Sequence, residues 1–326
     1  MEPLVSVIMP TFNRRQFLQP AIESLRNQSF SHWELIIADD GSDTDTRSYL
    51  QSVHAPPRIK VMRLSHSGRP SVVRNAALRE ARGEYIAFLD SDDLWLPRKL
   101  EIQMASLMRH PQRKWSYTAF SLVDGAGRPK DPLGDSRCPT PSGWIMEKML
   151  NDELVIVLPS VVVARQSLEQ VGPFDETLIM CEDDDLWVRL AVHSEIDGIE
   201  EPLTLIRRHG QHGGDDVTAW RDRGRVFTKA LGQITDPGVR SILRRLRAEM
   251  AAGLAGSQAA RGMRVSALST LAASVHYSAT YRQWWIGAAH AMVQAFTPAA
   301  LRNVVRLYRH RRRAKGDPPH RDPRGP

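Results

Sequence analysis

The sequence contains little cysteine and no long hydrophobic run. Only two of its 326 residues are cysteine, Cys138 and Cys181, too few for the disulfide framework of a small secreted protein. No secretory signal precedes the first apolar run, so we expect a protein of the reducing cytoplasm. The longest uncharged, apolar-rich stretch, residues 283–300, includes polar side chains and a proline and is a poor membrane span. No G-x-G-x-x-G motif occurs, which disfavours a dinucleotide-binding dehydrogenase.

Acidic residues are scarce in the last third of the chain. From Val217 onward 20 residues are Lys or Arg and 5 are Asp or Glu, whereas the first 216 residues contain 24 basic and 32 acidic residues. The formal net charge of +7 therefore combines an acidic part with a strongly basic one. We expect an acidic catalytic body, residues 1–216, and a basic appendage, residues 217–326, whose charge suits a negative surface such as lipid headgroups or nucleic acid.

The first 110 residues alternate between β-rich runs and helical patterns. Apolar runs of strand length cover residues 5–9, 34–38, 59–64 and 85–89, and helical periodicity lies between them at residues 17–25 and 72–82. This alternation predicts a mostly parallel α/β sheet covered by helices on both faces. Polar clusters follow three of the runs, and ligands bind beyond the carboxyl ends of strands in such sheets. The sequence therefore predicts a binding site at that edge.

After residue 110 the regular alternation of strand and helix patterns ends. Glycine and proline interrupt residues 113–158, which we interpret as a variable, acceptor-facing section. Strand character returns at residues 155–163 and 199–207, with a helix at residues 186–192 between them. From Val226 onward the chain is helical and alanine-rich, and we expect the polar, basic tail after Arg311 to be disordered.

Two carboxylates directly follow the fourth apolar run. Because side chains alternate along a strand, we expect Asp90 and Asp92 to project to the same face. Hard oxygen ligands in this position suit Mg²⁺ or Mn²⁺, which usually take one or two protein carboxylates together with phosphate oxygens. A turn or a helix cap is the alternative explanation of an Asp-x-Asp at a strand end.

Six segments spread in order over about the first 210 residues resemble the family 2 glycosyltransferases, nucleotide-sugar-dependent enzymes with the GT-A fold. They are residues 5–14 (VSVIMPTFNR), 38–42 (ADDGS), 74–77 (RNAA), 83–93 (GEYIAFLDSDD), 172–176 (GPFDE) and 182–190 (EDDDLWVRL). The resemblance implies a Rossmann-like, mostly parallel sheet flanked by helices, with a C-terminal helical appendage. Residues 1–110 would form its nucleotide-sugar half and residues 111–216 its acceptor half.

The resemblance places the nucleotide at the ends of the first two strands. Pro10, Thr11, Asn13 and Arg14 would line the base and ribose pocket. Asp40 would accept a hydrogen bond from the edge of the nucleobase. A plain turn also explains the segment around Asp40, because Asp, Gly and Ser are turn formers, and both roles are compatible.

The resemblance also implies a site for the sugar diphosphate. Arg69 or Arg74 would supply fixed positive charge and forked donors, with a surface arginine as the alternative. Asp92 would bind Mn²⁺ or Mg²⁺ directly. Asp90 would help through the sugar or a water, and Ser91 lies between the two carboxylates in the donor site.

We assign expected roles to three further residues: Asp93, His209 and Asp183. Asp93 is expected to cap a helix that begins in the next few residues. His209, in a segment that resembles the flexible basic loop of the family, is a candidate third metal ligand. The acidic run 182–185 suits the positive end of a helix dipole, and the resemblance makes Asp183 the general base that deprotonates the acceptor hydroxyl.

The basic appendage contains an amphipathic pattern. Residues 301–313 place apolar side chains on one helical face and arginines on another, as in helices that lie on anionic membranes. Interfacial anchors would be Trp284, Trp285, Met292 and Phe296; alternatively, they form the core of a small helical subdomain. No base-reading module accompanies the basic tail, so no nucleic acid partner is expected. We expect peripheral attachment to the inner face of the cell membrane.

The sequence therefore predicts an inverting, metal-assisted glycosyltransferase that moves a sugar, expected to be UDP-linked, to a lipid-linked or polysaccharide acceptor. A sugar nucleotidyltransferase is one alternative, although residues 10–13 stand where its glycine-rich, lysine-bearing phosphate loop should be. A degenerate, non-catalytic glycosyltransferase that acts as a surface-binding scaffold is the other. Retention of Asp40, of Asp90 with Asp92, and of Asp183 argues against a scaffold.

Overall fold

The computed structural model describes residues 4–129, 139–208 and 215–297. Contacts divide the chain into two compact units, Met1–Leu243 and Arg244–Pro326. No helix within the described residues is long and apolar enough to cross a membrane.

The division between the units falls inside helix α9 (Pro237–Ala260). Helix α8 (Asp216–Gln233) thus belongs to the first unit, whereas the charge pattern assigned everything after residue 216 to the basic appendage. Helix α8 packs against α7, and its Arg223 and Lys229 pair with acidic side chains of the first unit. A count of charges along the chain does not detect that these two basic side chains are paired with acidic ones.

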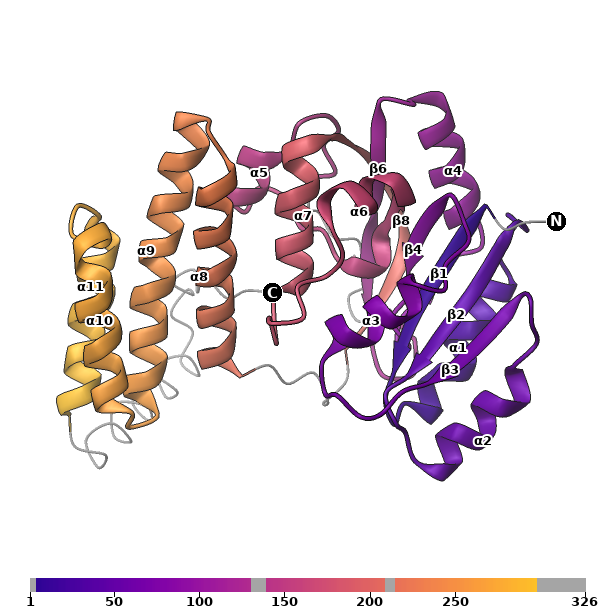
Figure 1. Ribbon diagram of the computed structural model, residues 1–326, viewed down its shortest axis with the longest axis horizontal. Helices are drawn as coiled ribbons and strands as arrows, with labels where there is room; N and C mark the ends of the chain where they lie inside the picture. The colour runs from indigo at the N-terminus through magenta and orange to yellow at the C-terminus, as the bar shows by residue number, and fades with distance from the viewer. Residues whose placement is uncertain (1–3, 130–138, 209–214, 298–326) are drawn as a thin grey trace. The chain divides into compact units, whose positions relative to one another are not determined.

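The first unit is built on an eight-stranded sheet (Figure 1). Its strands are β1 (Val5–Thr11), β2 (Trp33–Asp39), β3 (Ile59–Arg63), β4 (Tyr85–Phe88), β5 (Leu94–Trp95), β6 (Arg113–Val123), β7 (Val161–Ala164) and β8 (Glu195–Arg207). They lie in the order β3-β2-β1-β4-β7-β6-β8-β5. Strands β3, β2, β1 and β4 are mutually parallel, as are β6 and β8, while β7 and β5 pair antiparallel with their neighbours. The predicted α/β architecture, a mostly parallel sheet flanked by helices, is confirmed.

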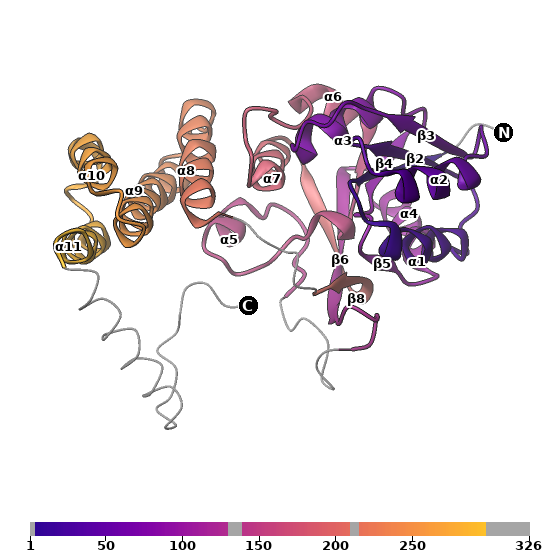
Figure 2. The same cartoon turned by 90° about the horizontal axis from the view of Figure 1, so that it is seen from below.

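Helices cover both faces of this sheet. The helices that lie wholly in the first unit are α1 (Arg15–Arg26), α2 (Thr44–Val53), α3 (Pro70–Leu78), α4 (Lys99–Arg109), α5 (Met146–Leu150), α6 (Arg165–Val171), α7 (Glu182–His193) and α8. Helices α1, α2 and α4 share one buried apolar cluster with the sheet, and Figure 2 shows α3 and α6 on the opposite side. The buried positions of α1 are those that its helical spacing predicts: Phe17, Leu18, Ala21, Ile22 and Leu25.

The carboxyl ends of β1, β2 and β4 lie along one edge of the sheet. Parallel pairing sets Thr11, the last residue of β1, beside Asp39, the last residue of β2. Gly83, just before β4, packs so closely on β1 that a Cβ there would lie 2.5 Å from the amide nitrogen of Ser6, so only glycine fits. The polar segments that follow these three strands therefore emerge side by side.

The second unit consists of the end of α9 with α10 (Arg264–Ser278) and α11 (Arg282–Phe296). Its buried cluster is mostly alanine. Gly287 lets α11 approach α9, because a Cβ at this position would lie 2.7 Å from the Cβ of Ala252. Small side chains thus allow the helices of this unit to pack closely.

Trp284 belongs to that helical core. Its side chain is buried, and its indole N–H donates to Ser274 Oγ at 3.1 Å. The structure therefore corrects the assignment of Trp284 as an interfacial anchor, whereas Trp285, Met292 and Phe296 are exposed. The predicted amphipathic helix after residue 300 lies outside the described residues.

Candidate active site

A cleft of about 720 Å³ opens beyond the carboxyl ends of β1, β2 and β4. The residues that were assigned to the site and line the cleft are Pro10, Thr11, Arg14, Asp40, Arg69, Arg74, Asp90, Ser91, Asp92 and Asp183. We call the lining residues between 10 and 93 the strand-end wall, and Ile179–Asp183 the helix-start wall. His209 lies outside the described residues.

Asn13 is the exception, because it does not line the cleft. Its backbone is left-handed with φ of 52°. The Asn13 amide donates to Ser42 Oγ at 2.9 Å, and its side-chain oxygen accepts from the Asp43 amide at 2.8 Å. Asn13 thus ties the loop after β1 to the loop after β2, and its assignment to the base pocket stays a prediction.

The buried carboxylate of Asp40 organises the strand-end wall. It accepts hydrogen bonds from the Ser67 amide at 2.8 Å, the Ser67 hydroxyl at 2.9 Å and the Gly68 amide at 2.9 Å. His66 Nδ1 lies 3.0 Å from Asp40 Oδ2, and the His66 ring stacks on Phe12 with centroids 4.2 Å apart. Sequence reasoning did not single out this aromatic pair, and no local spacing connects its two members.

The Asp90–Asp93 segment is a turn rather than the end of a strand. Strand β4 ends at Phe88, and the Asp93 amide donates to the Asp90 carbonyl at 3.0 Å. The expected strand alternation is therefore wrong as the reason why Asp90 and Asp92 share a face. The turn brings both carboxylates into the cleft instead.

Asp93 does not cap a helix, because Leu94–Trp95 form β5 and α4 begins only at Lys99. Its buried carboxylate instead accepts from the Arg207 amide at 2.8 Å. Burial, with the charges of Asp90 and Asp92, raises the pKa of Asp93 well above its ordinary value. The antiparallel pairing of β5 with β8 overrides the local helix signal, a long-range effect that spacing does not predict.

Arg207, at the end of β8, holds this turn from the other side. Its Nε donates to the Asp92 carbonyl at 2.7 Å, and its Nη1 donates to the Gly125 carbonyl at 2.7 Å. The side chain is buried. The strand expected at residues 199–207 therefore ends in a side chain that fixes the backbone on which Asp92 is carried, a role that sequence reasoning did not assign to Arg207.

Arg74 connects the two walls of the cleft. Its Nη2 donates to Asp90 at 2.8 Å and its Nη1 to Glu182 at 2.6 Å. Burial acts to lower the pKa of Arg74, but the charges of Asp90 and Glu182 outweigh it and the pKa is raised. Arg69 is exposed, and its Nη1 donates to the Glu176 carbonyl at 3.0 Å. Both terminal nitrogens of Arg74 thus donate to carboxylates, while the Arg69 side chain is in contact with solvent.

The carboxylates of the turn suit a divalent cation whose remaining ligands are oxygen atoms of a diphosphate. Asp92 lies 4.0 Å from Arg14 Nε, and both line the cleft beside Asp90. Among the described residues, no three His, Cys, Asp or Glu side chains come together as a self-sufficient metal site. Mg²⁺ and Mn²⁺ sites of the phosphate-binding kind require only one or two carboxylates from the protein.

Asp183 stands apart within the acidic first turn of α7. Glu182 pairs with Arg74, Asp184 with Arg223 and Asp185 with Arg189, whereas Asp183 makes no ion pair among the described residues. Burial, followed by the charges of Asp184 and Glu182, raises the pKa of Asp183 to about 7. The helix dipole opposes this rise but does not cancel it. The cleft thus contains a carboxyl group that exchanges protons near neutral pH.

Residues 6–113 match the sequence model of the family described as Glycosyl transferase family 2. Over this third of its length the chain is similar to glycosyltransferase family 2. TuaG of Bacillus subtilis (strain 168), named for teichuronic acid biosynthesis, is 43% identical over 131 residues, which cover 40% of this chain and 52% of TuaG. WfgD of Escherichia coli, named as a UDP-Glc:α-D-GlcNAc-diphosphoundecaprenol β-1,3-glucosyltransferase, is 37% identical over 107 residues, 33% of this chain and 42% of WfgD. The matches thus span about half of these relatives or less.

Solved structures show that the likeness in fold extends over most of the chain. TarS residues 1–349 from S. aureus, in complex with UDP-GlcNAc, superpose with a TM-score of 0.62 at 19% identity, covering 79% of this chain and 72% of TarS. The mannosyltransferase PcManGT from Pyrobaculum calidifontis, in complex with GDP-Man and Mn²⁺, gives 0.56 at 17% identity, with 90% and 85% covered. These likenesses confirm the predicted GT-A architecture.

Proposed function

We propose that this chain is a family 2 glycosyltransferase that transfers a sugar from a nucleotide-sugar to an acceptor hydroxyl, with inversion at the anomeric carbon. The observation that carries the proposal is Asp183, a carboxyl group with a pKa of about 7 in the same cleft as Asp40, Arg14 and Asp92. A base of this pKa is largely deprotonated just above neutral pH and accepts a proton more readily than an ordinary aspartate.

The proposed step is one displacement. The acceptor oxygen forms a bond to the anomeric carbon as the bond from that carbon to the diphosphate oxygen breaks. The hydroxyl proton passes to the Asp183 carboxylate, and the electron pair of the broken bond leaves with the nucleoside diphosphate. Attack from the side opposite the diphosphate inverts the configuration, and no nucleophile of the protein is required.

We assign the nucleoside diphosphate to the strand-end wall. Asp40 and the Phe12–His66 stack would receive the nucleobase, and the exposed guanidinium of Arg69 with that of Arg14 would face the diphosphate. Asp92, with Asp90, would hold Mn²⁺ or Mg²⁺, which when bound offsets the negative charge of the diphosphate. Arg74 would act mainly by fixing Asp90, because its donors already serve carboxylates.

The names of two relatives guide the choice of substrates. WfgD is named for a UDP-linked glucose donor and a diphosphoundecaprenol-linked acceptor, and TuaG for teichuronic acid biosynthesis. They support a UDP-linked donor and a lipid-linked or polysaccharide acceptor for this chain. The acceptor would enter past the apolar lining residues Ile156–Pro159 and Ile179.

A nucleotide-sugar screen tests the proposal. The purified chain is incubated with UDP- and GDP-linked sugars and Mn²⁺ or Mg²⁺, and release of nucleoside diphosphate is measured. We expect slow hydrolysis of one donor, and an inverted anomer by NMR once an acceptor is found. Release of pyrophosphate from a nucleoside triphosphate and a sugar phosphate would identify a nucleotidyltransferase. Donor binding without any turnover would identify a scaffold.

We also propose that the second unit attaches the enzyme to an anionic membrane surface at the inner face of the cell membrane. The support is an exposed apolar face on α11, formed by Trp285, Ile286, Met292, Val293 and Phe296. From residue 244 onward 15 residues are basic and 3 are acidic. Aromatic side chains at an interface and basic residues near lipid headgroups each favour such binding.

A further inference from the structure

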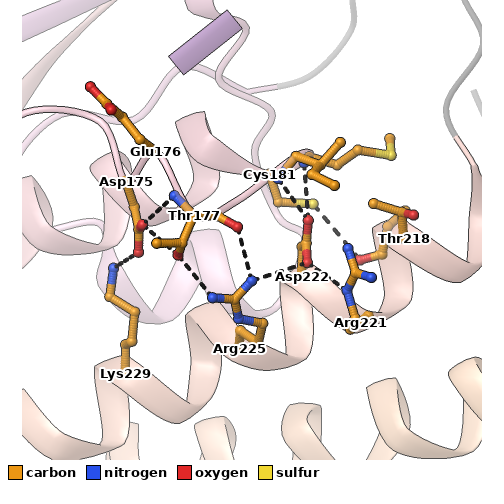
Figure 3. Close-up of polar contacts among 12 residues, drawn as sticks. Asp175, Glu176, Thr177, Cys181, Thr218, Arg221, Asp222, Arg225 and Lys229 are labelled. Atoms are coloured by element: carbon orange, nitrogen blue, oxygen red, sulfur yellow. Dashed lines mark hydrogen bonds and ion pairs between the residues drawn. The ribbon is translucent and has the colours of Figure 1, made fainter. Parts of the chain in front are cut away.

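Helix α8 carries a fully buried carboxylate that does not line the cleft. Asp222 has an exposed fraction of 0%. Its Oδ2 accepts hydrogen bonds from the amides of Ile179 at 2.9 Å and Met180 at 3.2 Å, and its Oδ1 accepts from Arg221 Nε at 2.9 Å (Figure 3). Arg225 Nη1 lies 3.6 Å from the same Oδ1. Both carboxylate oxygens are therefore engaged.

These contacts keep Asp222 ionised despite its burial. Burial acts to raise the pKa of Asp222, but the hydrogen bonds from Arg221 and from the amides of Ile179 and Met180 outweigh it, and the pKa is lowered. The bonds to the two amides are thus charge-assisted, about twice as strong as bonds between neutral groups. A buried charge of this kind fixes whatever backbone it binds.

The backbone that Asp222 binds is the helix-start wall. Ile179 and Met180 line the cleft and lead through Cys181 into α7, where Asp183 is the second helical residue. Cys181 has a left-handed backbone with φ of 62°, a conformation that residues other than glycine adopt rarely and at a cost. Such a conformation persists only when the surrounding structure holds it.

Other side chains of α8 support the same segment from both sides. Arg225 donates to the Thr177 carbonyl at 3.0 Å and to its hydroxyl at 2.8 Å, ahead of the wall. Lys229 lies 2.7 Å from Asp175 Oδ2 and 2.7 Å from Asp185 Oδ1, the latter within α7. Figure 3 shows the contacts of Arg225 with Thr177 and of Lys229 with Asp175 in one row with Asp222 along α8. Asp222 is the member of the row that bonds the wall itself.

We infer that Asp222 is a positioning residue for Asp183: its carboxylate holds the Ile179–Cys181 backbone so that the base is presented to the acceptor hydroxyl. The inference rests on the proposed role of Asp183 as the base. It also makes α8, which lies beyond residues 6–113, a required part of the catalytic apparatus.

The test compares Asp222→Ala and Asp222→Asn with Asp216→Asn, a matched control at an exposed carboxylate of the same helix. Hydrogen exchange is measured on peptides that cover residues 177–184 and on peptides from β1 and β4. Sugar transfer is measured as kcat and as the KM of the donor. Asp222→Asn keeps one acceptor oxygen and the size of the side chain, so it remains informative if Asp222→Ala does not fold.

We expect faster exchange at residues 177–184 in both Asp222 variants and unchanged exchange in the sheet. The kcat should fall roughly 10²-fold in Asp222→Ala, because small displacements of a reacting group have effects of this size. Asp222→Asn should lose less, the donor KM should change little, and Asp216→Asn should match the parent chain.

Two results would overturn the inference. Unchanged exchange at residues 177–184 in the folded variants would show that Asp222 does not hold the wall. Faster exchange with an unchanged kcat would show that the wall does not position the base. If the parent chain has no transfer activity while the exchange result stands, it is the proposed function that fails and not the anchoring of the wall.

Discussion

The two walls of the cleft are built in different ways. The strand-end wall follows directly from three parallel strands, and most of its hydrogen bonds join loops that succeed one another along the sheet edge, as Asp40 does with Ser67 and Gly68. The helix-start wall depends on side chains from α8, about 40 residues further along the chain. The first wall can be recognised from local sequence, and the second is assembled by tertiary contacts.

The comparison predicts that the walls can be impaired separately. The strand-end wall should govern donor binding and the departure of the diphosphate, whereas the helix-start wall should govern proton removal. Arg74, which bonds Asp90 in one wall and Glu182 in the other, should affect both.

The largest effect is expected from Asp92→Ala in the strand-end wall. Activity should depend on Mn²⁺ or Mg²⁺ and fall by roughly 10³-fold in the variant, because the charge of the diphosphate is no longer offset. Turnover is measured with and without a chelator, and circular dichroism checks that the fold is retained. Asp45→Ala, at an exposed carboxylate in α2, is the control. Full turnover in the presence of chelator would sink this prediction.

Asp183→Asn should slow transfer by roughly 10² or more while donor affinity is unchanged, because the amide keeps the shape but accepts no proton. A raised carboxyl pKa means that the folded protein binds the proton more tightly than the unfolded chain. The contribution of Asp183 to stability is therefore lost as pH rises from 3.8, the ordinary pKa, to about 7, and it stays lost above that. The variant should therefore be at least as stable as the parent at pH 8. Parallel loss of donor affinity and rate would make Asp183 part of the donor site instead.

Arg74→Met tests the connection between the walls. It leaves Asp90 and Glu182 without their shared guanidinium, so we expect a loss of about 2–3 kcal/mol in the free energy of unfolding. Both the donor KM and kcat should worsen by roughly tenfold, because the guanidinium bonds a carboxylate in each wall. Urea unfolding and steady-state kinetics provide the measurement. A change in only one kinetic parameter would contradict the bridging role.

The pH profile examines the helix-start wall without mutation. Because the ionised form of Asp183 is the active base and its pKa is about 7, transfer should rise with pH through 7 and level off above it. Below pH 6 the rate should fall about tenfold per pH unit. The same measurement on Asp183→Asn should show no such step. A step near pH 4 in the parent would indicate an ordinary carboxyl group.

The smallest effect on the cleft is expected from the second unit. Removal of Ala299–Pro326 should release the protein from anionic vesicles while donor hydrolysis continues, and higher salt should weaken binding of the full chain, since screening limits surface charges to about 10 Å at 0.1 M. Trp285→Ser together with Phe296→Ser should also weaken binding. Co-sedimentation decides, and equal binding by the full and truncated chains would refute the membrane role of the tail.

The sequence predicts the strand-end wall better than it predicts the helix-start wall. The strand-end wall was predicted in most of its residues, because parallel strands bring their carboxyl ends together whatever the details of the loops. The errors at Asp93 and in the Asp90–Asp92 alternation arose where β5 pairs with β8, a contact between segments more than 100 residues apart. Asp222 and Arg207 were missed for the same reason, and the burial of Trp284 depends on packing that hydrophobicity alone does not reveal.

Cys181 gives the protein a built-in reporter. Its thiol is partly buried at the start of α7, and burial, followed by the charges of Asp184 and Asp183, raises its pKa far above the ordinary value for a cysteine. The thiolate is the nucleophile that reacts with alkylating reagents, so this thiol should react slowly while Asp222 holds the wall in place. Its alkylation, followed by mass spectrometry of the peptide, would then time the opening of the wall. The rate at which Cys181 is alkylated would measure how often Asp183 leaves its position in the cleft.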